Sequence, residues 1–341
     1  MDFSIVIPTF NRCNFLKIAI NSILRQKDVT FEIIVSDNCS TDNTERWVKE
    51  FADKRIKYFK NKKNIGFPLN VREGFSKVSG RYIFTLSDDD FILYDNTLFE
   101  ILNVMKEYKV GMANIGAINW SKSVKFPCRI FNLSDKLIIV KSKKDKKLPL
   151  KALNINYAFY SGLIFDSSVI DRNQIIESYM YSFYPLIFDT ARKYGLVYIP
   201  NHFIVARISL RFVPHYYSLD KLGSFFMEEH LSLIQQYLYA EDYKKHKKEY
   251  ILGSIINLPS IKLFTNNQNY IRILIKTVNL DKMLLVNSKF IILVLIGFIP
   301  KFILKRLREF MIYLSEKKNV NLVKKYNYSQ NLEELDTFKL S

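Results

Sequence analysis

The first 110 residues alternate short runs of branched and aromatic residues with segments of helical periodicity. The runs have the length and composition of buried strands, and they lie at residues 4–7, 31–35, 56–59 and 82–86. Apolar residues recur every three or four positions over residues 14–26 and 97–108. Because strands and helices that alternate in this way form a mainly parallel sheet with helices on both faces, we predict an α/β fold.

The pattern loosens after Ile115 and changes again near residue 220. Further strand-like pieces lie at residues 116–120, 137–140, 161–165 and 197–199, and a helix is predicted over residues 184–193. From about Leu219 onward the helical period dominates. We therefore predict two domains, an α/β domain at residues 1–220 and a helical C-terminal region at residues 221–341.

The hydrophobic pattern predicts neither a secretion signal nor a membrane-spanning helix. The first residues lack the basic region of a signal peptide and enter a strand-like segment at once. The longest apolar run, residues 290–299, ends at Pro300. It is shorter than the roughly 20 residues that span a bilayer.

Composition narrows the class of protein. Hydrophobic residues make up 48% of the 341 residues, which excludes a disordered chain. Lysine and arginine outnumber aspartate and glutamate by 51 to 33, and the net charge of +18 suits an anionic partner, although a bias toward lysine across the whole chain explains it equally well. Cys13, Cys39 and Cys128 form no C-x-x-C pair, so we expect no disulfide framework or zinc site and favour a reducing compartment.

Three adjacent carboxylates follow the fourth predicted strand. This strand, residues 81–86, runs through Ser87 into Asp88, Asp89 and Asp90. Ligands of open α/β sheets bind at the carboxyl ends of the strands, and carboxylates that repel one another there favour a bound divalent cation such as Mg²⁺ or Mn²⁺. The alternative is a solvated acidic turn that precedes the next helix.

Several common motifs are missing from the sequence. Neither G-x-G-x-x-G nor G-x-x-x-x-G-K-[ST] occurs, which argues against a dinucleotide-dependent dehydrogenase and a P-loop NTPase. H-E-x-x-H and G-x-S-x-G are absent as well, so the zinc hydrolases and the α/β-hydrolases receive no support.

Polar residues also follow the other early strands, and their order is informative. The segments are residues 5–12 (IVIPTFNR), 35–42 (VSDNCSTD), 64–66 (NIG, followed by Asn70) and 80–90 (GRYIFTLSDDD). In this order and spacing they resemble the N-terminal half of the family 2 glycosyltransferases, which have the GT-A fold. The resemblance covers about residues 3–110 well and the rest of the chain loosely.

The resemblance implies a role for each of these segments. Contacts to a nucleotide-sugar donor are implied for Pro8, Thr9, Phe10, Arg12, Asp37, Asn64, Gly66 and Asp88. Coordination of Mn²⁺ or Mg²⁺ is implied for Asp89, Asp88 and Asp90, with Asp89 as the first choice. The resemblance implies that Asp37 contacts the base, where a buried carboxylate would select for the N3 hydrogen of uracil.

Simpler interpretations of some of these residues stay open. Asn64 and Gly66 fit a plain turn equally well, and Asp90 fits a capping role better than metal contact. Two positions depart from the family pattern. Ser87 stands where many relatives have an acid, and Cys39 replaces a frequent glycine.

Sugar transfer with inversion also requires a general base for the acceptor hydroxyl. Asp189 lies 100 positions after Asp89, where relatives place an aspartate, so the resemblance makes it the leading candidate. Phe188 replaces the glutamate that often precedes it, and an ion pair with Lys193 one turn later is the alternative role. Asp166 and Asp171 are the reserve candidates.

The C-terminal region combines basic clusters with apolar helical segments, notably residues 290–304 followed by the basic residues 305–308. This combination suits an anionic membrane surface. Packing on the first domain, or on a second copy in a homo-oligomer, explains the same pattern.

The resemblance therefore implies a metal-dependent glycosyltransferase of the hexosyltransferase type in bacterial surface polysaccharide synthesis. We expect a UDP-sugar donor, a glycan or lipid-linked acceptor and a cytoplasmic protein peripheral to the plasma membrane. The alternatives are a sugar-nucleotide pyrophosphorylase and a basic scaffold or nucleic-acid-binding protein. Nucleic acid is not the expected partner.

Overall fold

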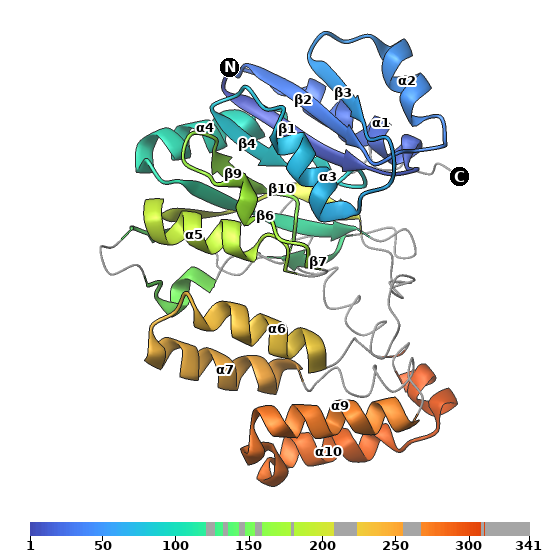
Figure 1. Ribbon diagram of the computed structural model, residues 1–341, viewed down its shortest axis with the longest axis vertical. Coiled ribbons are helices and arrows are strands. Elements are labelled where there is room, and N and C mark those ends of the chain that lie inside the picture. Colours follow the sequence, from blue (N-terminus) through green and yellow to red (C-terminus); the bar gives the residue numbers. More distant parts are fainter. Residues whose placement is uncertain are drawn as a thin grey trace. The chain divides into compact units, whose positions relative to one another are not determined.

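The computed structural model describes residues 1–120, 127–131, 136–142, 147–153, 159–178, 181–207, 224–254, 267–307 and 310. They belong to two compact units, one within Met1–Leu210 and one within Arg211–Asn321 (Figure 1). The domain boundary predicted near residue 220 lies among residues 208–223, outside the described part, and stays a prediction.

The first unit is built on one ten-stranded sheet. Its strands are β1 (Phe3–Thr9), β2 (Phe31–Asp37), β3 (Ile56–Lys60), β4 (Tyr82–Thr85), β5 (Phe91–Ile92), β6 (Met112–Trp120), β7 (Pro127–Phe131), β8 (Ile138–Val140), β9 (Leu163–Asp166) and β10 (Leu196–Arg207). The main path through the sheet is β3-β2-β1-β4-β9-β6-β10-β5. β7 adds to β6, and β8 adds to β10.

The sheet has a parallel half and a mixed half. Strands β3, β2, β1 and β4 are all parallel, as predicted from the early alternation of strands and helices. β9 is antiparallel to both of its neighbours, β4 and β6, while β10 pairs in parallel with β6. The carboxyl ends of β1, β2 and β4 therefore meet at one edge.

Helices cover both faces of the parallel half. The helical elements of this unit are α1 (Cys13–Leu24), α2 (Thr44–Phe51), α3 (Phe67–Phe75), α4 (Thr97–Tyr108), η1 (Leu150–Leu153), η2 (Arg172–Gln174) and α5 (Tyr184–Tyr194). Ile5 and Ile7 share one hydrophobic cluster with residues of α1 and α4. Val6 points to the opposite face, where α3 lies across β1 and β2. The predicted α/β class is confirmed.

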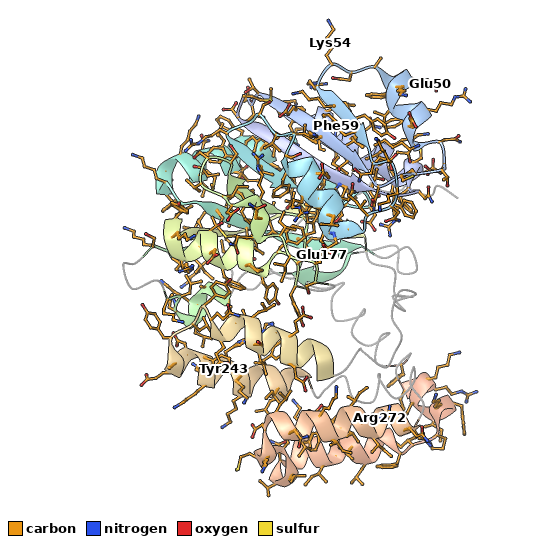
Figure 2. The ribbon with its side chains drawn as sticks, in the orientation of Figure 1. Glu50, Lys54, Phe59, Glu177, Tyr243 and Arg272 are labelled. Atoms are coloured by element: carbon orange, nitrogen blue, oxygen red, sulfur yellow. The ribbon has the colours of Figure 1, made fainter. Side chains whose placement is uncertain are left out.

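Helix α3 comes very close to the sheet. A Cβ atom on Gly74 would lie 2.7 Å from Cγ1 of Val6 and 3.2 Å from Cβ of Ser36. Glycine is required here by this close approach. On the outer side of the unit, Glu50 of α2 and Lys54 before β3 are exposed (Figure 2).

The second unit is helical, which confirms the predicted helical C-terminal region. It consists of α6 (Ser224–Gln235), α7 (Ala240–Ser254), α9 (Asn267–Leu280), η5 (Lys282–Val286) and α10 (Ser288–Gly297). Its core contains buried Leu231, Ile251, Tyr270, Leu284 and Phe290, one from each element. Within the described residues, every helix is too short or too polar to cross a bilayer.

Candidate active site

The loops that follow β1, β2 and β4 converge at one edge of the sheet. In the register of β1 and β2, the last pair is Thr9 with Asp37. β4 runs beside β1 on the other side and leads directly into Asp88 and Asp89. The hydroxyl of Thr9 donates a hydrogen bond of 2.8 Å to Oδ2 of Asp88, which joins the two loops.

The carboxylates of Asp88 and Asp89 both contact the guanidinium group of Arg12. Nη1 of Arg12 lies 3.1 Å from Oδ1 of Asp88 and 2.9 Å from Oδ2 of Asp89. Asp88 is only 5% exposed. Burial, followed by the charge of Asp89, raises the pKa of Asp88 to about 7. A positive charge between the two aspartates is therefore strongly favoured.

The donor set fits a hard divalent cation. Mg²⁺ and Mn²⁺ are commonly held by one or two carboxylates, with water and substrate phosphates as the remaining ligands, and Asp88 and Asp89 supply two. In the part of the chain that the structure describes, His, Cys, Asp and Glu side chains form no group of three or more that could hold a metal by itself. Asp90 accepts a hydrogen bond from Ser161 and is 3% exposed, which favours its structural role.

The segment before β9 holds the acidic loop in place. Oγ of Ser161 accepts a hydrogen bond of 2.8 Å from the backbone N–H of Ser87 and donates one to Asp90. The backbone N–H of Leu163 donates to the hydroxyl of Thr85 at 3.0 Å. The sequence indicated a strand at residues 161–165 but not its place beside β4. The contacts of Ser161 with the acidic loop were therefore not predicted.

Asp37 is fully buried, and both its oxygens accept hydrogen bonds. Oδ1 accepts from the backbone N–H of Ser40 at 2.9 Å, and Oδ2 accepts from the hydroxyl of Tyr58 on β3. Burial and this carboxylate raise the pKa of Tyr58 above its ordinary value. Tyr58 was not singled out from the sequence, where it is one residue of a short strand. The contact depends on the register of β3 against β2, where Tyr58 lies opposite Val35, two residues before Asp37, and the sequence does not give that register.

The loops after β1 and β2 are joined to each other. The backbone N–H of Asn11 donates to Ser40 at 2.8 Å, and the backbone N–H of Cys13 donates to Asp42 at 3.0 Å. Pro8 lies inside β1 and is buried. Phe10 is 36% exposed at the start of the joined loops, so its ring is accessible to a planar ligand.

Asn64 and Gly66 shape the backbone before α3. Oδ1 of Asn64 accepts from Nδ2 of Asn38 at 2.7 Å and from the backbone N–H of Gly66 at 3.0 Å. Gly66 has a φ of +82°, which glycine adopts without strain. These contacts support the turn interpretation and tie the turn to the β2 loop through Asn38, a residue that was not predicted.

Asp189 lies on α5, outside the contacts that join the loops of the sheet edge. Its Oδ1 accepts from Nε of Arg192 at 2.5 Å, so its ion pair is with Arg192 and not with the predicted Lys193. The start of α5 is anchored to the site loops. The ring of Phe183 lies 6.1 Å from that of Phe67 at the start of α3 and 5.3 Å from that of Tyr160.

The two reserve candidates for the base differ in what the structure shows of them. Asp166 pairs with Tyr82 in the register of β4 and bonds Arg81 at 2.6 Å, so it lies at the opposite end of β4 from Asp88. Asp171 accepts a hydrogen bond from the backbone N–H of Asn173 and begins η2. The register places Asp166 away from the carboxylates, and Asp171 stays an untested alternative.

Comparison with known families and structures agrees with this geometry. Residues 4–169 match the family model described as Glycosyl transferase family 2. Among curated proteins, the abequosyltransferase RfbV of Salmonella typhimurium is 27% identical over 203 residues, which cover 55% of this chain and 60% of the relative. The GalNAc(5)-diNAcBac-PP-undecaprenol beta-1,3-glucosyltransferase of Campylobacter jejuni is 42% identical over 93 residues, covering 26% and 30%. The chain thus spans less than two thirds of either relative.

Solved structures show the same fold. TarS 1–349 of S. aureus superposes with a TM-score of 0.60 at 16% identity, covering 82% of this chain and 81% of that one. The mannosyltransferase PcManGT of Pyrobaculum calidifontis gives a TM-score of 0.50 at 13% identity, covering 88% and 86%. These likenesses confirm the predicted GT-A arrangement. Residues 4–169 therefore form a glycosyl transferase family 2 domain.

Proposed function

We propose that this protein transfers a sugar from a UDP-sugar to a hydroxyl of a lipid-linked or glycan acceptor during synthesis of a bacterial surface polysaccharide, such as capsule, lipopolysaccharide or lipooligosaccharide. Two similar proteins are named for glucosyl transfer to undecaprenol-linked diphosphates, and one of them, WfgD of Escherichia coli, is named for UDP-Glc. TarS was solved with UDP-GlcNAc. These names support the donor and acceptor classes.

One observation carries the proposal. Thr9 lies beside Asp37 in the sheet and bonds Asp88, so the acid proposed to contact the base lies at the same edge as the acids proposed to hold the cation. A nucleoside diphosphate needs both a base contact and neutralisation of its phosphates. Phe10 and Asp37 would hold the base, and Arg12 would approach the diphosphate.

Asp88 and Asp89 would hold the divalent cation, Mn²⁺ or Mg²⁺. When bound, such a cation neutralises the charge that develops on the departing diphosphate. Arg12 already places a cationic nitrogen between the same two carboxylates. In the complex, Arg12 would exchange these carboxylates for phosphate oxygens of the donor.

Asp189 is the proposed general base. It would take the proton of the acceptor hydroxyl as that oxygen attacks the anomeric carbon from the face opposite the diphosphate. The new glycosidic bond then forms while the bond to the diphosphate breaks, which inverts the anomeric configuration. Arg192 beside Asp189 would hold the carboxylate in orientation.

The decisive experiment is calorimetric titration of UDP, GDP and single-stranded nucleic acid, each with and without Mn²⁺. We expect binding of UDP that strengthens with Mn²⁺ and falls at least tenfold in Asp89→Ala. The matched control is Asp95→Ala, an aspartate that pairs with Arg25 and Lys27 and should bind UDP normally. Indifference to UDP, or salt-sensitive binding of the nucleic acid alone, would refute the proposal.

A second experiment separates catalysis from binding. Asp189→Asn should lose transfer by about 100-fold or more while it binds UDP normally, since general base catalysis contributes on the order of 10²–10⁴-fold. Asp95→Asn serves as the control, because Asp95 pairs with Arg25 and Lys27 and has no proposed role in transfer. Analysis of the product by NMR tests inversion, and retained configuration would exclude the mechanism.

We also propose a cytoplasmic location at the inner face of the plasma membrane. A lipid-linked acceptor requires the enzyme to work at a membrane surface. Cys13 and Cys39 are both free thiols, which suits a reducing compartment.

A further inference from the structure

The second unit exposes large apolar side chains along its C-terminal half. They are Ile271, Ile275, Met283, Leu285, Val286, Ile291, Ile292, Leu295, Phe298, Phe302, Ile303, Leu307 and Phe310. Val286 is 74% exposed, Phe302 is 70% and Met283 is 69%. Soluble monomers rarely expose contiguous apolar patches larger than a few hundred Å². We call these residues, together with the cations between them, the apolar–basic surface.

On α9 the apolar and basic residues share one stripe. Ile271, Arg272, Ile275 and Lys276 are all exposed, while Tyr270, one position before them, is buried in the core. Positions four apart lie on the same face of a helix, so each isoleucine is followed by a cation on the outer side. Figure 2 shows Arg272 on this helix. This arrangement is typical of helices that lie in a membrane interface.

η5 and α10 extend the surface with more apolar residues. η5 buries Leu284 and exposes Met283, Leu285 and Val286. From Phe290 to the end of α10 the sequence contains no polar side chain. At about 1.5 Å per residue, this helix is roughly 15 Å long, about half the hydrocarbon thickness of a bilayer. It is suited to lie in the interface rather than to cross it.

The charges of residues 267–307 indicate which kind of partner could cover the exposed apolar side chains. Residues 267–307 contain seven lysines and arginines and one aspartate, a net charge of +6 in a chain of +18. All seven cations are exposed: Arg272, Lys276, Lys282, Lys289, Lys301, Lys305 and Arg306. A second copy of this surface would bring cations against cations. An anionic lipid headgroup layer is complementary to both the apolar and the basic residues.

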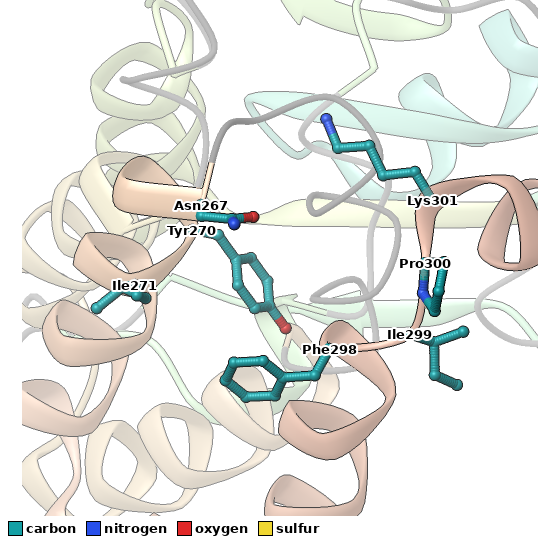
Figure 3. Close-up of a pocket in the computed structure, with 7 residues that line it drawn as sticks. All are labelled: Asn267, Tyr270, Ile271, Phe298, Ile299, Pro300 and Lys301. Carbon is teal, nitrogen blue, oxygen red and sulfur yellow. The ribbon is translucent and has the colours of Figure 1, made fainter.

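We propose that the apolar–basic surface docks on an anionic bilayer, with its apolar side chains among the headgroups and upper acyl chains and its cations on lipid phosphates. A pocket of about 300 Å³ opens in the same surface between α9 and the segment 298–301 (Figure 3). Tyr270 and Phe298 line it, and Lys301 lies at its edge. The pocket offers one place where a lipid phosphate meets Lys301.

Sedimentation of the full chain with vesicles tests the proposal. We expect binding to vesicles of phosphatidylcholine with phosphatidylglycerol, weaker binding to pure phosphatidylcholine, and release by high salt. The apolar variant is Val286→Ser with Leu295→Ser and Phe302→Ser, and its bound fraction should fall at least tenfold. Its matched control, Phe51→Ser with Phe99→Ser and Leu137→Ser, changes exposed apolar residues of the first unit and should bind normally.

A charge variant tests the electrostatic part separately. Lys276→Gln with Lys282→Gln and Lys289→Gln should weaken binding to the anionic vesicles by about fivefold per lysine, since each is worth about 1 kcal/mol near such a surface. The control triple, Lys54→Gln with Lys63→Gln and Lys109→Gln, removes the same charge from exposed sites of the first unit.

Three outcomes would overturn the proposal. They are no binding to either vesicle, equal loss in the control and test triples, and a dimer in light scattering that the apolar variant dissociates. The last outcome would assign the surface to a second copy of the chain. Calorimetry with UDP is run on every variant, so loss of vesicle binding is distinguished from loss of donor binding.

Discussion

At the scale of single residues, Cys39 carries a backbone conformation that favours glycine. Its φ is +70°, in the left-handed region, and it lies in the loop after Asp37. A β-branched side chain in this region is strongly disfavoured. We expect Cys39→Gly to change the free energy of unfolding by less than about 1 kcal/mol, and Cys39→Val to lower it by about 1–2 kcal/mol. Urea denaturation measures both, and equal stability of the two variants would contradict the prediction.

Tyr58 offers a second test at this scale, because its hydroxyl donates to the fully buried carboxylate of Asp37. Tyr58→Phe leaves that oxygen without its donor, and we expect a loss of about 1–3 kcal/mol in unfolding free energy. UDP affinity should fall as well, since Asp37 loses its fixed orientation. Tyr194→Phe is the control, because Tyr194 is 43% exposed. Normal stability and UDP affinity in Tyr58→Phe would show that the hydrogen bond is dispensable.

At the scale of secondary structure elements, the seating of α3 on the sheet depends on Gly74. Alanine would gain about 1 kcal/mol of helix propensity, but its Cβ would lie 2.7 Å from Val6. We expect the steric effect to dominate and Gly74→Ala to lower the free energy of unfolding by about 1–3 kcal/mol. Glu73→Ala, at the exposed neighbouring position, should change it by less than about 0.5 kcal/mol. Thermal melts of both variants test this prediction. A Gly74→Ala protein as stable as the wild type would show that α3 can move away from the sheet at little cost.

Most elements were predictable because their signals are local. The strand at Phe31–Asp37 contains the branched apolar run Ile33–Val35, and the helix at Thr97–Tyr108 repeats its apolar residues at the helical period. The position of β9 between β4 and β6 was not predictable. It depends on antiparallel pairing across about 80 residues, and no periodicity encodes that choice.

The candidate site divides in the same way. Thr9, Asp37, Asp88 and Asp89 were found because each lies at or just after the end of a strand, where parallel topology gathers side chains at one edge. Ser161 holds Asp90 from 71 residues away, and nothing in the surrounding sequence marks it. Contacts that depend on how loops fold against one another were the ones that sequence patterns missed.

At the scale of the whole molecule, the two units differ in how they respond to acid. α6 and α7 meet at His230 and His246, whose Nε2 atoms lie 2.7 Å apart, and His230 stacks on Tyr250 at 3.9 Å. One imidazole must donate to the other, so the accepting ring is neutral. Burial, followed by the charge of His246, lowers the pKa of His230 to about 3, and burial also lowers the pKa of His246.

The sign of the pH dependence follows from these lowered values. In the unfolded chain both histidines bind protons below about pH 6.5, whereas the folded second unit resists protonation. The stability from the pair is therefore complete above pH 6.5. It falls as the pH drops below 6.5, by at most about 1.4 kcal/mol per pH unit for each histidine, and for His230 the loss continues toward pH 3. In the first unit, carboxylates such as Glu32 have lowered pKa values, so the losses that they cause begin only near their unfolded values of about 4. The raised pKa of Asp88 acts in the opposite direction and adds stability as the pH falls from about 7.

The second unit should consequently lose stability first between pH 6.5 and pH 5. Both tryptophans, Trp47 and Trp120, belong to the first unit, so their fluorescence follows that unit while far-ultraviolet circular dichroism follows the helices of both. In thermal melts at pH 7 and pH 5, the dichroism transition should move to lower temperature, whereas the fluorescence transition should stay or move to higher temperature. The double variant His230→Phe, His246→Leu should show no such shift of the dichroism transition. It has no imidazole at these two positions to take up protons. If the dichroism and fluorescence transitions move together in the wild type and in the double variant, groups other than His230 and His246 cause the acid sensitivity.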